Sequence, residues 1–205
     1  MRIVLATRNA HKVGELQAVL EPLLPGVEVL TVDAFEGVPE VAETEVTFAG
    51  NALLKAHAVA RATGVPAVAD DSGIAVDVLG GSPGVFSARW AGRHGDDVAN
   101  LELLLAQIAD VPAEHRGGAF VCAAAIALPD GTSAVRLGEL RGTVTTAPTG
   151  GGGFGYDPVF VPVGADRTLA EHTAQEKNAI SHRGAAFRAL APVVVDALAG
   201  RPIHD

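Results

Sequence analysis

Short apolar runs and amphipathic stretches alternate along the first third of the chain. Most residues of 2–6, 27–32 and 65–69 are β-branched or apolar, which predicts short buried strands. In 10–21 and 48–63 the apolar residues recur at the spacing of a helix that buries one face. Strands that alternate with helices in this order predict an α/β fold.

The rest of the chain adds a pair of strands that return on each other. The segment 119–128 is a continuous apolar run, and Asp130-Gly131 marks a hairpin that leads back through 133–146. A hairpin beside strand–helix units predicts a mixed β-sheet flanked by helices, with two lobes around a central cleft. Because no repeat or long linker divides the chain, we expect one domain over 1–205. The other expected elements are a half-buried strand at 74–78, a helix at 96–109 and a last helix at 183–199.

Composition narrows the class of protein. Apolar residues make up 48% of the 205 residues, which is enough for a full core and argues against global disorder. No apolar run approaches the length of a membrane span, and the N-terminal run is too short for a signal peptide. A single cysteine, Cys122, excludes an internal disulfide. Together, the cysteine count and the lack of a long apolar run predict a cytoplasmic protein with no membrane partner. A net charge of −9 disfavours a nucleic-acid binder, so a few placed cations must hold any anionic ligand.

Two adjacent carboxylates follow the apolar run at 65–69, where the strand is expected to end. Asp70 and Asp71 precede Ser72, and neighbouring carboxylates repel each other unless a cation or a proton lies between them. In extended backbone their side chains point to opposite faces, so one can face a cleft and bind Mg²⁺ or accept a proton from water. A solvated turn is the alternative, because Asp-Asp-Ser-Gly is favourable turn chemistry.

The turn from the first strand into the first helix indicates a phosphate site. Such a turn presents backbone amides and the positive end of a helix dipole. The segment lacks the glycines of a P-loop. A helix cap at Asn9 with a solvated Lys12 is the alternative. The candidate residues are Thr7, Arg8, Asn9, Ala10, His11 and Lys12.

An acidic stretch precedes the second helix and indicates a metal ligand. Glu43 lies in it, and carboxylates are ligands that Mg²⁺ accepts beside phosphate oxygens. An acidic surface loop is the alternative.

A run of glycines at 150–153 leads into an aromatic segment, in a chain with only 4% aromatic residues. Glycines let the backbone approach a ligand closely, and the rings of Phe154 and Tyr156 offer faces on which a base can stack. Asp157 can accept hydrogen bonds from ring N–H groups. A glycine hinge with both rings in the core is the alternative.

A second cationic segment precedes and begins the last helix. Ser181 can cap that helix, which places His182 and Arg183 in its first turn, where cations oppose the helix dipole. An anionic or polar partner should compensate them, and Arg183 can bind a carbonyl or a phosphate through two hydrogen bonds. A satisfied surface histidine is the alternative for His182.

Taken together, these segments resemble the Ham1-type noncanonical purine nucleoside triphosphate pyrophosphatases, also called inosine triphosphate pyrophosphatases. Each motif alone is weak, but six of them run in family order, at family spacing, over nearly the whole chain. They are Leu5-Ala6-Thr7-Arg8-Asn9 with Lys12 and Glu15; Thr47-Phe48 with Asn51-Ala52 and Lys55-Ala56; Ala69-Asp70-Asp71-Ser72-Gly73; Ser82-Pro83-Gly84-Val85-Phe86-Ser87-Ala88-Arg89; 153–158; and Glu176-Lys177 with Ser181-His182-Arg183-Gly184.

The resemblance implies an elongated, two-lobed α/β fold with a mixed sheet, and a homodimer. It implies Mg²⁺-dependent hydrolysis of ITP, dITP and XTP between the α and β phosphates, which gives the monophosphate and pyrophosphate. The implied biological role is the removal of deaminated purines from the nucleotide pool.

The resemblance also implies roles for individual residues. Asp71 accepts a proton from the attacking water and, with Glu43, holds Mg²⁺, while Asp70 is a further candidate ligand. The segment from Thr7 to Lys12 cradles the phosphates together with Ser72 and Lys177. The base is held by Phe154, Gly155, Tyr156, Asp157, His182 and Arg183.

One residue departs from the family pattern, and two other functions are to be weighed. The family commonly has an acidic residue just before Asn51, where this chain has Gly50. Glu40 and Glu45 lie close enough to Glu43 to share its expected role. A Maf-like nucleotide pyrophosphatase is disfavoured by the His182-Arg183 pair. A nucleotide sensor that does not hydrolyse its ligand would not need Asp71.

Overall fold

The computed structural model describes residues 1–7 and 10–203. The chain forms two compact units, which we call unit 1 and unit 2. The chain passes between them within β3, β4 and β5 and at the start of α5, so no separate linker joins them. Unit 1 comprises Met1–Asp71, Cys122–Gly138 and Arg183–Asp205, and unit 2 comprises Ser72–Val121 and Glu139–His182.

Six strands form one sheet in the order β2-β1-β3-β4-β5-β6. β1 pairs in parallel with both β2 and β3, whereas β5 and β6 pair antiparallel. The sheet is therefore mixed, which confirms the predicted α/β class with flanking helices. The strands are β1 Arg2–Leu5, β2 Glu28–Thr31, β3 Ala67–Val76, β4 Gly117–Ala127, β5 Ser133–Val144 and β6 Phe160–Pro162.

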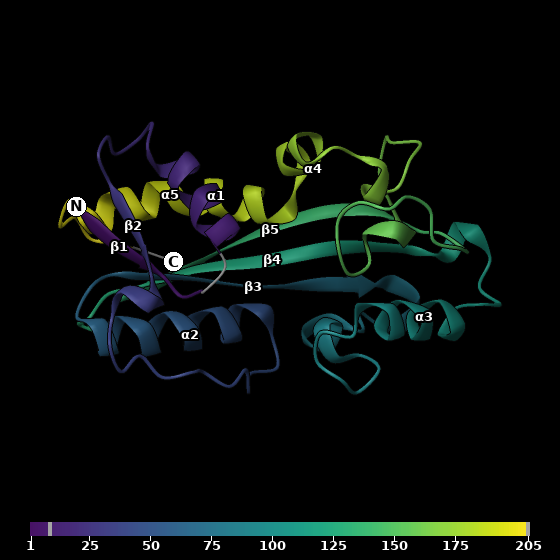
Figure 1. Ribbon diagram of the computed structural model, residues 1–205, viewed down its shortest axis with the longest axis horizontal. Helices are drawn as coiled ribbons and strands as arrows, with labels where there is room; N and C mark the ends of the chain where they lie inside the picture. The colour runs from purple at the N-terminus through teal and green to yellow at the C-terminus, as the bar shows by residue number, and fades with distance from the viewer. Residues whose placement is uncertain (8–9, 204–205) are drawn as a thin grey trace. The chain divides into compact units, whose positions relative to one another are not determined.

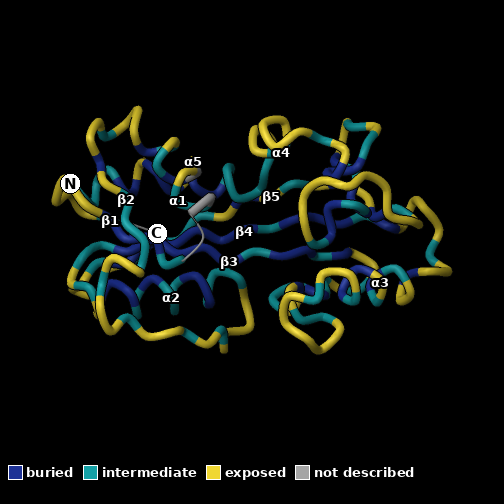
Figure 2. Tube along the Cα trace, viewed as in Figure 1, coloured by how far each residue is buried: buried dark blue, intermediate teal, exposed yellow. Residues whose placement is uncertain are grey.

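Helices cover both faces of the sheet in unit 1. α1 (Ala10–Leu20) and α5 (His182–Leu198) lie on one face, and α2 (Phe48–Thr63) lies on the other (Figure 1). Successive side chains of β1 point to opposite faces, so Ile3 packs in the cluster with α1 and α5 while Val4 packs against α2. β1 is buried beyond Arg2 and β3 is buried over most of its length (Figure 2), as strands with helices on both sides must be, whereas the edge strand β2 is only partly buried.

Local sequence sets the ends of α2, whose bounds match the predicted helix at 48–63. The Thr47 side chain accepts a hydrogen bond from Gly50 N at 3.0 Å and so caps the first turn. Gly64 ends the helix in the left-handed conformation, with φ of 68°. Small residues on the inner face, such as Ala52 and Ala56, let the helix lie close to the sheet.

Unit 2 packs its own core around Ile74, Leu104 and Phe160, with α3 (Asp97–Gln107) and α4 (Ala174–Ile180) among its elements. Its most deeply buried charge is Arg116, whose guanidinium donates to four main-chain carbonyls, those of Ile108, Val111, Val144 and Thr145. No helix in the described part of the chain is long and apolar enough to cross a membrane.

The strand predicted to end at Asp70 does not end there. β3 continues through both carboxylates to Val76, so the predicted Asp-Asp-Ser-Gly turn is wrong. Gly73, which suggested a turn, serves close packing instead, because a Cβ there would lie 2.7 Å from the carbonyl oxygen of Gly84. Ser87 fills the adjoining space and accepts a hydrogen bond from Ile74 N at 2.9 Å. The short strand β6 was not predicted from the sequence.

Candidate active site

The order of strands in unit 1 creates a position for a site at the end of β1. β2 and β3 lie on either side of β1 in the sheet. The connection from β1 to β2 runs through α1 on one face, and the connection from β2 to β3 runs through α2 on the opposite face. In α/β sheets, ligands bind at such a reversal of strand order, beyond the carboxyl ends of the strands. β1 ends at Leu5, which pairs with Val68, so Asp70 and Asp71 lie just past the end of β1 although they are inside β3.

Asp70 points to the face of α1 and α5 and forms a buried ion cluster. Lys12 Nζ donates to both of its carboxylate oxygens at 2.9 Å, and Arg183 Nε donates to Oδ2 at 3.1 Å. The residue is 4% exposed. Burial alone would raise the pKa of Asp70, but the charges of Lys12 and Arg183 outweigh it and hold that pKa well below its usual range. Asp70 is therefore the ionised counterion of Lys12 and Arg183, both of which were predicted from the sequence to bind the substrate.

Asp71 points to the face of α2 and has a different environment. Asn51 Nδ2 donates to its Oδ2 at 3.0 Å, and Lys55 Nζ lies 3.7 Å from its Oδ1. Burial raises the pKa of Asp71, and the nearby carboxylates of Glu43 and Asp70 add to this, while Lys55 and Asn51 oppose it. A carboxylate with raised proton affinity beside a polar cluster suits a general base. The expectation that the two aspartates serve opposite faces agrees with these contacts.

Glu43 is joined to Asp71 through one ammonium group. Lys55 Nζ donates to Glu43 Oε1 at 2.5 Å and lies near Asp71 as well, so two carboxylates converge on one cation. Mg²⁺ is a hard cation that binds carboxylate oxygens, and these two carboxylates already converge on one positive charge. The pair therefore fits Mg²⁺, for which water and phosphate would supply further ligands. No group of three or more His, Cys, Asp or Glu residues that could hold a metal ion occurs among the described residues.

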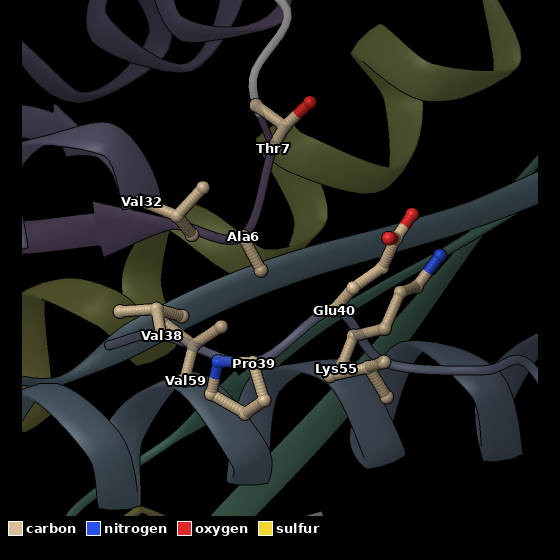
Figure 3. A pocket seen from close by; sticks show the side chains of 9 residues that line it. Ala6, Thr7, Val32, Val38, Pro39, Glu40, Lys55 and Val59 are labelled. Carbon is tan, nitrogen blue, oxygen red and sulfur yellow. The ribbon is translucent and has the colours of Figure 1, made fainter. Parts of the chain in front are cut away.

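A cavity of about 250 Å³ lies beside this cluster, between the end of β1 and α2 (Figure 3). Thr7 lines it at the end of the strand, and the ends of the Glu40 and Lys55 side chains point in the same direction (Figure 3). Valines 32, 38 and 59 form an apolar wall. Thr7, predicted to bind phosphate, therefore shares a cavity with Lys55. Glu40 lines this cavity, whereas Glu43 is the residue bonded to Lys55.

A second cluster, in unit 2, forms around the Asp157 carboxylate. Asp157 Oδ2 accepts hydrogen bonds from Phe154 N, at 2.8 Å, and from Lys177 Nζ. The Lys177 ammonium also lies 4.3 Å from the centre of the Phe154 ring, which is a cation–π contact. Gly153 has φ of 71°, and a Cβ there would collide with the Asp157 carboxylate. These contacts hold the Phe154 backbone while its side chain stays exposed.

The structure places both Tyr156 and Asp157 in the interior of unit 2. Tyr156 is 5% exposed and donates its hydroxyl to Ser87 O at 2.9 Å, so its ring is a core residue and offers no face to a base. Asp157 is buried and already holds Lys177 and the Phe154 backbone. Phe154 is the exposed ring of the segment, and Gly155 N donates to Asp97 Oδ2 at 3.0 Å.

The remaining candidates lie in several places. His182 begins α5 and stacks on Phe120, with ring centroids 5.1 Å apart and planes at 17°. Ser72 is a half-buried residue of β3, and Ser181 donates its hydroxyl to Asn178 O at 3.2 Å. Arg8 and Asn9 lie outside the described residues, so the phosphate and cap assignments made for them stay predictions. Ala10 and His11 form the start of α1, and their side chains are likewise outside the description.

Several residues of these clusters received no role from the sequence. Asn51 and Lys55 both lie in the motif that carries the resemblance, and their spacing of four places them on one face of α2. This spacing was the available signal for a shared site. Asp97 and Phe120 carried no comparable local signal.

Comparison with known proteins identifies the family to which the chain belongs. A profile of the Ham1 family matches residues 3–193. A dITP/XTP pyrophosphatase of Streptomyces coelicolor is 65% identical over 197 residues, which cover 96% of this chain and 98% of that protein. A dITP/XTP pyrophosphatase of Corynebacterium efficiens is 52% identical over 98% of this chain and the whole of that protein.

Solved structures give the same result. The crystal structure of a nucleoside-triphosphatase / dITP/XTP pyrophosphatase from Mycobacterium abscessus superposes with a TM-score of 0.80 at 52% identity, over 94% of this chain and 100% of that one. A HAM1 protein from Coxiella burnetii superposes with a TM-score of 0.88 at 37% identity, over 96% of this chain and 99% of that one. The resemblance drawn from the motifs is confirmed, and the chain belongs to the Ham1 family.

Proposed function

We propose that this protein hydrolyses noncanonical purine nucleoside triphosphates, namely ITP, dITP and XTP, to the monophosphate and pyrophosphate. The observation that carries the proposal is the buried Asp71 carboxylate, whose pKa is raised, with Asn51, Lys55 and Glu43 around it. The names of the relatives in Streptomyces and Corynebacterium support the substrate class. Removal of deaminated purines from the nucleotide pool follows from that activity.

The residues of unit 1 have different roles at the phosphates in this proposal. Asp71 accepts a proton from the water that attacks at the α phosphate, and its raised proton affinity suits this role. Lys12 and Arg183 supply positive charge to the phosphates while Asp70 keeps them in place. Glu43 and Asp71 would hold Mg²⁺. When bound, the ion neutralises phosphate charge and favours departure of pyrophosphate.

Residues of unit 2 are proposed to select the base. The Phe154 ring is exposed for stacking, with Lys177 over one of its faces. His182 is a donor suited to the oxygen that inosine and xanthosine carry on C6. Adenine has an amino group at that position and would leave the donor unpaired, at a cost of about 1–3 kcal/mol. Guanine shares the C6 oxygen, so its rejection must depend on the 2-amino group.

The direct test is pyrophosphate release from ITP, XTP, GTP and ATP, each with and without Mg²⁺. We expect release from ITP and XTP at rates well above those for ATP, and only with Mg²⁺ present. Equal rates on ATP and ITP would contradict the proposed specificity. No release from any of the four would favour a nucleotide sensor. A homodimer in the cytoplasm belongs to the same proposal, and light scattering of the purified protein tests the dimer.

Phe154→Ala tests the base-binding role of the exposed ring. The KM for ITP should rise about 10-fold, because stacking of a base on an aromatic ring contributes about 1–3 kcal/mol. The Tm should stay unchanged, because the side chain is 64% exposed. Steady-state kinetics and thermal unfolding measure the two effects.

Tyr156→Phe is the matched control for Phe154→Ala. It removes the buried hydroxyl that donates to Ser87 O and should lower the free energy of unfolding by about 1 kcal/mol, with an unchanged KM. If the two variants raised the KM equally, the distinction drawn between the two rings would be incorrect.

A further inference from the structure

Asn51 links two segments that carry the charged groups of unit 1. It lies in the first turn of α2 and is 0% exposed. Its Oδ1 accepts a hydrogen bond from Glu45 N at 3.0 Å, and its Nδ2 donates to Asp71 Oδ2 at 3.0 Å. One buried amide therefore connects the segment that bears Glu43 with the strand that bears Asp71.

The chemistry of the two partners fixes the orientation of this amide. The main-chain N–H of Glu45 can only donate, so the side-chain oxygen of Asn51 must face it. The amide nitrogen must then face Asp71, where it meets a carboxylate oxygen that accepts. The two oxygens of Asp71 thus have different surroundings, since Oδ2 takes the Asn51 bond while Oδ1 faces Lys55 at 3.7 Å.

Gly50 allows the Glu45 segment to reach Asn51. A Cβ at position 50 would lie 2.8 Å from Glu45 Cβ and 3.1 Å from Glu45 Cγ. Only a residue without a side chain lets Glu45 lie this close to the start of α2. Glu43 is two residues earlier and meets Lys55, one helical turn beyond Asn51. The departure from the family pattern at Gly50 therefore has a physical consequence in this chain.

We propose that Asn51 is a positioning residue for the proposed hydrolysis. It holds Asp71 by Oδ2, so that Oδ1 is turned toward Lys55, and it keeps the Glu43 segment against the same helix. This inference rests on the proposed function. Asn51 touches neither water nor phosphate in this scheme, so it acts only through Asp71 and the Glu45 backbone.

Asn51→Ala and Asn51→Asp test the proposal, with Asn100→Ala as the matched control. Asn100 is also a buried helical asparagine, 1% exposed, whose Oδ1 accepts a main-chain N–H, that of Ala91, at 2.7 Å. Its Nδ2 has no partner among the described residues, so it links no carboxylate. Asn51→Asp keeps the acceptor for Glu45 N, and it replaces the donor to Asp71 with a second carboxylate oxygen, which repels Asp71 or shares a proton with it.

We expect both Asn51 variants to lower kcat for ITP about 100-fold, the loss that a small misplacement of a catalytic group produces, with KM changed less than about 3-fold. Asn100→Ala also removes a buried hydrogen bond and should lower the Tm, but it should keep the kcat of the unchanged protein. Equal kcat in the Asn51 and Asn100 variants, or a loss confined to KM, would overturn the positioning role. If the unchanged protein releases no pyrophosphate from ITP or XTP, it is the proposed function that fails, and the inference fails with it.

Discussion

Asp71→Asn should lower the rate of pyrophosphate release from ITP by about 100-fold to 10,000-fold, the range that general-base catalysis contributes. The substitution keeps the shape of the side chain and removes its capacity to take a proton from water. Nucleotide binding should persist, because Lys12 and Arg183 are held by Asp70 on the opposite face of β3. Single-turnover assays measure the rate, and calorimetric titration with ITP measures the binding.

Asp130→Asn is the control for this experiment. Asp130 is an exposed carboxylate in the turn between β4 and β5, and it accepts a hydrogen bond from Thr132 N. Its substitution should leave the rate unchanged. Turnover by Asp71→Asn at a near-normal rate would show that another group accepts the proton, and the assignment of Asp71 would be wrong.

Asp70→Asn should destabilise the protein by about 3–5 kcal/mol, the usual cost of removing one partner from a buried ion pair. The variant leaves Lys12 and Arg183 beside each other without their shared counterion. Urea denaturation at neutral pH measures the change in the free energy of unfolding. Asp77→Asn is the matched control, because Asp77 pairs with Arg141 on the surface, where such a pair contributes less than about 1 kcal/mol.

The difference in stability between the unchanged protein and Asp70→Asn should depend on pH. The pKa of Asp70 is held below its ordinary value of 3.8 in the folded protein, so the folded state favours the ionised form. Its contribution to stability is present above about pH 4 and is lost as the pH falls through the lower, folded-state pKa. The difference in stability between the unchanged protein and Asp70→Asn should therefore narrow below pH 4. A constant difference down to pH 2 would mean that the cluster does not stabilise the ionised carboxylate.

Periodicity in the sequence was sufficient for the elements whose causes are local. The helix at 48–63 has its cap, its apolar face and its terminating glycine within the segment itself, and its bounds were predicted correctly. The continuation of β3 through Asp70 and Asp71 was not predictable in this way. Burial of those charges depends on Lys12 and Arg183, which are 58 and 113 residues away from Asp70 in the chain. Without knowledge of those partners, the turn propensity of the Asp-Asp-Ser-Gly segment was a stronger signal than any indication that the strand continues.

The aromatic segment shows the same limit at the level of single side chains. Phe154 and Tyr156 are two residues apart in one motif, and nothing in their local pattern separates them. Their exposure is decided by partners elsewhere in unit 2, since the Tyr156 hydroxyl meets the Ser87 carbonyl while Phe154 lies under Lys177. The chemistry of the segment could therefore propose both rings for a site, but only the fold shows which ring is buried and which is exposed.

The interleaving of the two units has a consequence for how the protein is made. Unit 1 includes β1 and also α5, which is synthesised after the strands β1–β6 and the helices α1–α4. Until that helix arrives, the apolar side chains of β1 and α1 lack the cover of Phe187 and Leu190, and Asp70 lacks Arg183. Unit 1 cannot fold as a finished domain during synthesis, as contiguous N-terminal domains do. A chain that ends before α5 should therefore be recovered as aggregated, inactive protein, and neither unit is suited to exchange as an independent module.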